Sequence, residues 1–139
     1  MVNNINEQTD GDSLMLDFPV FDTKNGILGM FQKVGFDIKR VLIMKDMKEG
    51  DIRGGHTHHK TRQILFALDG GCTVDLDYGD KKDSVKLDKF TQGVKLEPYV
   101  WHVMRDFTPG TILMVLASME YDEADYIRNY DDFLAIIKK

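Results

Sequence analysis

The sequence predicts an all-β fold, a small antiparallel barrel or sandwich, followed by a single C-terminal helix. Short runs of strand-forming residues recur about every 8–12 residues, with glycine- or proline-containing turns between them. From Cys72 to Tyr78, apolar residues alternate strictly with polar ones. This period of two is typical of a strand with one buried face and one solvated face.

The expected strands follow one another through one domain. Residues 1–13 are polar and predict a flexible N-terminal arm, and residues 14–139 predict a single domain. The sequence Asp69-Gly70-Gly71 predicts a hairpin, because glycine tolerates the positive φ of such turns. Strands are expected over Phe36–Met44, Arg62–Leu68, Cys72–Tyr78, Ser84–Leu87, Gly93–Glu97, Tyr99–Phe107 and Thr111–Ala117.

Only the end of the chain shows a helical pattern, over residues 122–138. Asp122 is a typical N-cap residue, and Lys138 and Lys139 suit the negative end of the helix dipole. The apolar residues that recur at helical spacing are Ala124, Ile127, Tyr130, Leu134 and Ile137.

Composition and charge narrow the classes of function. The 139 residues suffice for one globular domain, and the formal net charge of −5 argues against a nucleic-acid partner. The single cysteine, Cys72, excludes an intrachain disulfide and a cysteine-based zinc site, and we expect it in the core. The sequence shows neither a signal peptide nor an apolar stretch of the roughly 20 residues that cross a membrane. We therefore expect a cytoplasmic protein with no membrane contact.

Histidines are the strongest candidates for chemistry. If the chain around His56 is extended, His56 and His58 point to one face and His59 to the other. His102 lies in a later strand, and a barrel interior would bring it to the first two. The alternative is that these are surface histidines, or core histidines with satisfied hydrogen bonds.

The spacing of these residues resembles the two motifs of the cupin superfamily. The first motif would be Gly50, five residues, His56-x-His58, four residues, Gln63, six residues and Gly70. The second would run from Gly93 through Pro98 to His102. This resemblance implies a cupin fold, a double-stranded β-helix or RmlC-like jelly-roll barrel.

In metal-binding cupins the ligands fall at the positions of His56, His58, Gln63 and His102. Gln63 stands where those proteins have a glutamate, and a neutral amide is a poor ligand for a divalent ion. We therefore expect no metal and no other cofactor. A metal-dependent cupin enzyme, such as a dioxygenase that uses the three histidines, remains an alternative.

Four segments resemble the nucleotide-sugar 3,4-ketoisomerases more closely. The segments are Phe36–Arg40, Arg53–Lys60, Val100–His102 and Tyr121–Asp131. The resemblance implies conversion of TDP-4-keto-6-deoxyglucose to its 3-keto isomer, in the biosynthesis of 3-amino-3,6-dideoxy sugars for surface glycans. It also implies a TDP-linked 4-keto-6-deoxy sugar as ligand and a homodimer that exchanges N-terminal strands.

The chemistry of that reaction suits the candidate residues. Moving a ketone from C4 to C3 requires proton transfer near neutral pH, where histidine titrates. By resemblance, His56 and His58 are the acid/base pair, and the sequence does not decide which of them takes the C3 proton. Gln63 and His102 are expected to contact the enediolate oxygens.

Arginines are the expected ligands of the diphosphate, because their guanidinium forks match phosphate oxygens. Arg40 and Arg53 occupy positions that match the family. His102 follows Trp101 as in the branch that forms the galacto product, which implies TDP-3-keto-6-deoxygalactose. The chain departs from the family at Leu42-Ile43, where other members carry tyrosines. A 3,5-epimerase and a non-catalytic sugar-binding cupin remain further alternatives.

Overall fold

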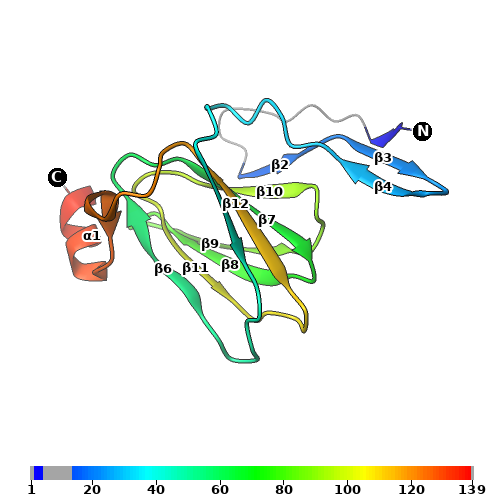
Figure 1. Cartoon of the computed structure of the whole chain (residues 1–139). Helices are drawn as coiled ribbons and strands as arrows, with labels where there is room; N and C mark the ends of the chain where they lie inside the picture. The colour runs from blue at the N-terminus through cyan, green and yellow to red at the C-terminus, as the bar shows by residue number, and fades with distance from the viewer. Residues whose placement is uncertain (1, 5–13, 139) are drawn as a thin grey trace.

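Two five-stranded antiparallel sheets face each other and enclose a core (Figure 1). The computed structural model describes residues 2–4 and 14–138. The first sheet has the order β2-β10-β7-β12-β5 and the second the order β13-β6-β11-β8-β9. This architecture confirms the predicted cupin barrel with one C-terminal helix.

The elements are β1 (Val2–Asn4), β2 (Met15–Asp17), β3 (Val20–Thr23), β4 (Gly26–Gly29), β5 (Arg40–Met44), β6 (Arg53–His58), β7 (Gln63–Asp69), β8 (Cys72–Asp77), β9 (Lys82–Leu87), β10 (Gln92–Leu96), β11 (Trp101–Arg105), β12 (Ile112–Ala117), a 3-10 turn (Glu123–Asp125), β13 (Tyr126–Ile127) and α1 (Tyr130–Ile137).

The first sheet is buried on both faces at its centre. Leu65 of β7 and Leu113 of β12 point into the barrel, where they join the main apolar cluster. Ile64 and Phe66 of β7 point outward and pack under the segment that precedes β5, through Phe31 and neighbouring residues. This double burial explains why β7 and β12 have continuous apolar runs instead of an alternating pattern.

The second sheet confirms the alternation predicted between Cys72 and Tyr78. Cys72, Val74 and Leu76 are buried in the main cluster. Asp77 is also buried. Its carboxylate accepts hydrogen bonds from the Tyr130 hydroxyl at 2.6 Å and from the backbone N–H of Gly79 at 2.8 Å, and these bonds offset the cost of burying it. Burial raises the pKa of the Cys72 thiol to about 11, as expected for a core cysteine.

The N-terminal part contains strands that the sequence analysis did not predict. β3 and β4 form a hairpin that protrudes from one end of the barrel (Figure 1), and β2 pairs with β10. Residues 2–4 of the predicted flexible arm form β1, which pairs with β3. The rest of that arm, residues 5–13, lies outside the described residues.

The C-terminal helix is shorter than the predicted 122–138. α1 begins after Asn129, whose side chain accepts a hydrogen bond from the backbone N–H of Asp132. Asp122 instead caps the 3-10 turn, and β13 then pairs with β6. The first half of the predicted helix is therefore held in the second sheet. No helix in the described part of the chain is long and apolar enough to cross a membrane.

Candidate active site

Three histidines come together inside the barrel, as the strand pattern predicts. His56 and His58 lie on the inner side of β6. His102 lies on the neighbouring strand β11, directly opposite His56. The ring centroids lie 4.7 Å apart for His56 and His102, 5.3 Å for His56 and His58, and 6.4 Å for His58 and His102. His59 points to the other side, where its Nδ1 lies 3.1 Å from the Tyr99 hydroxyl.

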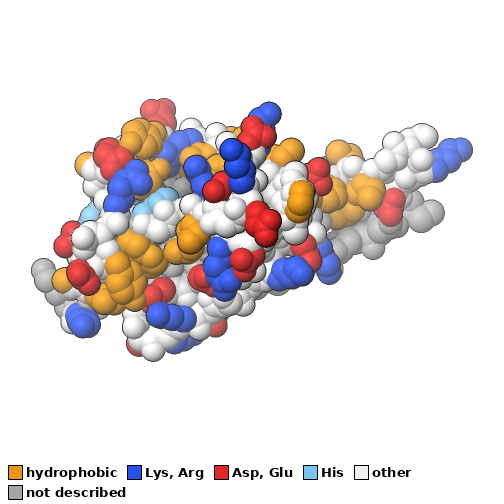
Figure 2. Space-filling view, turned by 90° about the horizontal axis from the view of Figure 1, so that it is seen from below, with side chains coloured by type: hydrophobic (Ala, Val, Ile, Leu, Met, Phe, Trp, Pro, Cys, Tyr) orange, Lys and Arg blue, Asp and Glu red, His pale blue; other side chains and the backbone are white. Residues whose placement is uncertain are grey.

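Two ring nitrogens of this cluster have no hydrogen-bond partner among residues 2–4 and 14–138. They are Nδ1 of His56 and Nε2 of His58, and both are buried. Buried polar atoms in proteins are almost always hydrogen-bonded, to water or a ligand if not to protein. His56 is half-buried, so the cluster opens to solvent; Figure 2 shows histidine side chains at the surface between charged and hydrophobic groups. Both nitrogens are therefore placed to contact a bound molecule.

All three imidazoles are held neutral near pH 7. Burial, together with repulsion from His56 and His58, lowers the pKa of His102 to about 3. Burial likewise lowers the pKa of His56 to about 4, with added repulsion from His58 and Arg128. The pKa of His58 is also lowered by burial, although Asp125 opposes the shift. Neutral imidazoles can accept a proton, which is what a general base requires.

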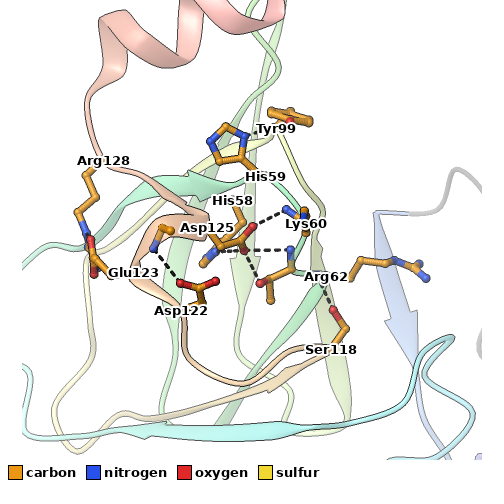
Figure 3. Close-up of polar contacts among 12 residues, drawn as sticks. His58, His59, Lys60, Arg62, Tyr99, Ser118, Asp122, Glu123, Asp125 and Arg128 are labelled. Atoms are coloured by element: carbon orange, nitrogen blue, oxygen red, sulfur yellow. Dashed lines mark hydrogen bonds and ion pairs between the residues drawn. The ribbon is translucent and has the colours of Figure 1, made fainter.

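Asp125 is a part of the site that the sequence analysis missed. Its Oδ2 lies 3.2 Å from Nδ1 of His58, and both side chains are buried (Figure 3). Burial would raise the pKa of Asp125, but hydrogen bonds from the Thr61 hydroxyl and from the backbone N–H groups of Lys60 and Thr61 lower it overall. The carboxylate is therefore ionised beside His58.

Tyr126 and Arg128 follow Asp125 and complete one wall of the site. The Tyr126 ring lies 4.3 Å from the His58 ring and 5.1 Å from the His56 ring. The Arg128 guanidinium lies 4.1 Å from the centroid of the Tyr126 ring and donates to Glu123 at 2.8 and 2.9 Å. The sequence of residues 121–131 resembles the family, which could have pointed to a functional role. Its apolar residues recur at helical spacing, however, so the segment was predicted as part of a helix and not as part of the site.

Two of the other predicted site residues, Gln63 and Arg40, lie on the wall of the barrel opposite the histidines. Gln63 is 4% exposed and lies on the inner side of β7, in line with Leu65 and Ala67. Arg40 and Gln63 both pair with Ala117, one on each side of β12, so they share the opposite wall.

The two predicted arginines differ in how closely they approach the histidines. Nε of Arg40 is buried without a partner, and its guanidinium lies 5.7 Å from the Tyr121 ring. Arg53 is exposed at the start of β6, at the far end from His58.

The donor set does not fit a metal centre. No group of three or more histidine, cysteine, aspartate or glutamate side chains is arranged to hold a metal ion within residues 2–4 and 14–138. Asp125 uses its oxygens for His58, Lys60 and Thr61, and Gln63 offers only a neutral amide. We therefore derive no chemical step through a metal.

The chain matches a known protein family over almost its whole length. The family described as FdtA, WxcM-like, C-terminal, matches residues 11–138. The TDP-4-oxo-6-deoxy-alpha-D-glucose-3,4-oxoisomerase of Aneurinibacillus thermoaerophilus is 40% identical over 122 residues, which cover 86% of this chain and 88% of that protein. The chain belongs to the TDP-4-keto-6-deoxyglucose 3,4-ketoisomerase family. It is an isomerase, as the sequence predicted.

Solved structures of 3,4-ketoisomerases share the fold. The structure of a mutant of QdtA from Thermoanaerobacterium thermosaccharolyticum, in complex with TDP-4-keto-6-deoxyglucose, is 36% identical with a TM-score of 0.87; the match covers 89% of this chain and 92% of that one. Two Campylobacter jejuni enzymes are each 34% identical with a TM-score of 0.82. WlaRA, a TDP-fucose-3,4-ketoisomerase, matches 88% of this chain and 93% of its own, and WlaRB, a TDP-quinovose 3,4-ketoisomerase, matches 87% and 95%. Overall similarity therefore does not distinguish the two product branches.

Proposed function

We propose that this isomerase converts TDP-4-keto-6-deoxy-D-glucose into TDP-3-keto-6-deoxy-D-galactose by histidine-mediated proton transfer. The observation that carries the proposal is the pair of buried, unpartnered ring nitrogens on His56 and His58. The substrate is the one named for the Aneurinibacillus relative and bound in the QdtA structure. The product would supply the biosynthesis of 3-amino-3,6-dideoxy sugars for surface glycans, in the cytoplasm.

The reaction balances without a redox cofactor. A base removes the proton from C3 while O4 gains a proton, which gives an enediol with a C3–C4 double bond. The O3 hydroxyl then loses its proton and C4 receives one, so that the ketone stands at C3. His56 and His58 are the acid/base pair in this scheme, since both are neutral near pH 7 and lie side by side.

Four further residues would contact the substrate. The Gln63 amide can donate hydrogen bonds to an enediolate oxygen, and His102 lies close enough to His56 to contact the same sugar. Arg40 and Arg53 would bind the diphosphate, and the unpartnered Nε of Arg40 supports its role.

The galacto product rests on His102. By resemblance to the family, a histidine directly after Trp101 is typical of the members that form the galacto product. His102 is 2% exposed and packs against His56, so its side chain lies within the reacting cluster. The vicinal coupling constant of the C4 proton in the product distinguishes galacto from gluco directly.

We expect a homodimer with exchanged N-terminal strands. Ile27 and Leu28 on the protruding hairpin are 58% and 59% exposed, and Val41 and Ile43 on the edge strand β5 are 55% and 54% exposed. Exposed apolar side chains and an open sheet edge favour pairing with a second chain. Light scattering should give twice the chain mass for the wild type and a monomer for Ile27→Asp with Leu28→Asp. Ile52→Asp, at a residue 67% exposed elsewhere, is the control and should stay dimeric.

Proton NMR of the enzyme with TDP-4-keto-6-deoxyglucose in D₂O tests the function. We expect deuterium at C4 of the product and, through return of the enediol, at C3 of the substrate, with no added metal. Exchange at C5 as well would favour a 3,5-epimerase, and binding without exchange would favour a sugar-binding cupin. Exchange that depends on an added metal would favour the metal-dependent alternative.

A further inference from the structure

The carboxylate of Asp125 is tied to the turn that immediately follows His58. Its Oδ1 accepts a hydrogen bond from the Lys60 N–H at 2.7 Å, and its Oδ2 accepts one from the Thr61 N–H at 3.1 Å. The Thr61 hydroxyl donates to Oδ2 as well. The backbone of Asp125 adds a further link, since its carbonyl accepts from the His59 N–H at 2.9 Å. The carboxylate therefore has a fixed position relative to the end of β6.

This arrangement selects one tautomer of His58. An ionised carboxylate can only accept hydrogen bonds, and its other donors are already fixed by the backbone and by Thr61. Its contact with Nδ1 of His58, at 3.2 Å, therefore requires a proton on that nitrogen. In a neutral imidazole the other nitrogen, Nε2, then carries the lone pair. Nε2 is the buried atom of His58 without a partner.

Neither His56 nor His102 has a carboxylate within hydrogen-bond distance of its ring, among the described residues. Nδ1 of His56 has no partner, and Nδ1 of His102 lies 3.4 Å from the Val100 carbonyl oxygen. Within the described residues, a carboxylate reaches only one of the three clustered imidazoles.

We propose that Asp125 is a positioning residue for the isomerisation: anchored by Lys60 and Thr61, it holds His58 with its proton on Nδ1 and its lone pair on Nε2, directed at the substrate. The ionised carboxylate also stabilises the imidazolium that forms when Nε2 takes a proton. This inference rests on the proposed function for its catalytic consequence, whereas the tautomer is a property of the free enzyme.

Nitrogen-15 NMR of histidine-labelled enzyme without substrate tests the tautomer. We expect a neutral His58 with Nδ1 protonated near pH 7, and loss of that single tautomer in Asp125→Ala. Assignment uses single histidine variants. A wild-type His58 protonated on Nε2, or an unchanged tautomer in Asp125→Ala, would overturn the inference whatever the substrate of the enzyme is.

Kinetics test the consequence. In Asp125→Asn we expect kcat to fall by about 100-fold or more with a much smaller change in KM, because binding groups are untouched. Asp122→Asn is the matched control: Asp122 lies in the same segment and caps Ala124 at 3.0 Å, but is exposed, so kcat should stay at the wild-type value. Equal kcat for Asp125→Asn and wild type would refute the role. Absence of exchange in the wild type would refute the proposed function instead.

Discussion

His102 and His56 lie directly opposite one another where β11 pairs with β6, with their ring centroids 4.7 Å apart. Two imidazoles this close inside a barrel cannot both carry a charge at low cost, so His56 adds to the effect of burial in lowering the pKa of His102. The sheet pairing therefore keeps neutral, proton-accepting rings in the site near pH 7. This property connects the fold with the proposed chemistry.

Replacement of either of the two β6 histidines should strongly slow proton exchange. In His56→Asn and in His58→Asn we expect the rate of deuterium incorporation at C4 of the product to fall by about 10²–10⁴-fold, the usual contribution of a general acid or base. His59→Asn is the control, because His59 points to the other side of β6 and contacts Tyr99. NMR in D₂O measures all three rates. If both β6 variants exchange as fast as wild type, the acid/base assignment is wrong.

The pH dependence of kcat/KM should report the lowered pKa of His58. The base must be neutral, and burial lowers its pKa below the ordinary 6.5, so activity should persist below pH 6.5 before it declines. Asp125 raises that pKa, so its replacement by asparagine should move the acid limb to still lower pH. The charged and titratable groups around His58 are Asp125, His56, His102, Arg40 and Arg128. An acid limb centred above pH 6.5 would contradict this prediction.

Burial of His102 should make the fold sensitive to acid. Its pKa is about 3 in the folded protein and 6.5 in the unfolded chain, so between these values only the unfolded chain takes up the proton. The free energy of unfolding should therefore fall as the pH falls, by about 2 kcal/mol from this residue between about pH 7 and pH 5. Urea unfolding at the two pH values measures this loss. His102→Gln should show correspondingly less, and an identical loss in the variant would contradict the prediction.

Activity should survive metal removal. Asp125 is engaged by His58 and Thr61, and Gln63 supplies no charge to a cation, so dialysis against a chelator should leave the exchange rate unchanged. Gln63→Glu should bind zinc more tightly than wild type, because it adds a carboxylate to the inner wall. Elemental analysis of both proteins provides the measurement. About one metal ion per wild-type chain, with activity lost on its removal, would establish the metal-dependent alternative.

Much of the barrel was predictable because its signals are local. Alternation over Cys72–Tyr78 and the glycines after Asp69 report strand and turn geometry within a few residues. The histidine cluster followed from the same rule, since His56 and His58 are two residues apart on one strand. The cupin motif spacing then linked them to His102.

The segment 121–131 was harder to predict because its structure depends on distant contacts. Its apolar residues do recur at helical spacing, yet β13 pairs with β6, and Asp125 binds a turn 64 residues earlier in the chain through Thr61. No local pattern reports such pairing. The hairpin of β3 and β4 was missed for a related reason: it protrudes from the barrel, so its strands do not show an alternation of buried and exposed residues.

Gly54 should be indispensable for the relation between His56 and His102. Gly54 and Gly55 both have positive φ, 84° and 76°, at the irregularity where β6 pairs with β11. A Cβ on Gly54 would lie 2.8 Å from the His102 carbonyl oxygen, a backbone atom that cannot move without displacing β11, whereas a Cβ on Gly55 would meet nothing within 4 Å.

Gly55→Ala should therefore cost only the backbone strain, about 1–2 kcal/mol. Gly54→Ala should cost the same strain and a further 1–3 kcal/mol or so from the collision, and it should lower kcat because it shifts His102 from His56. Urea unfolding and NMR exchange rates on the two variants separate these effects. Because both substitutions add one methyl group at positive φ, equal losses of stability would mean that the close approach to His102 does not constrain the site.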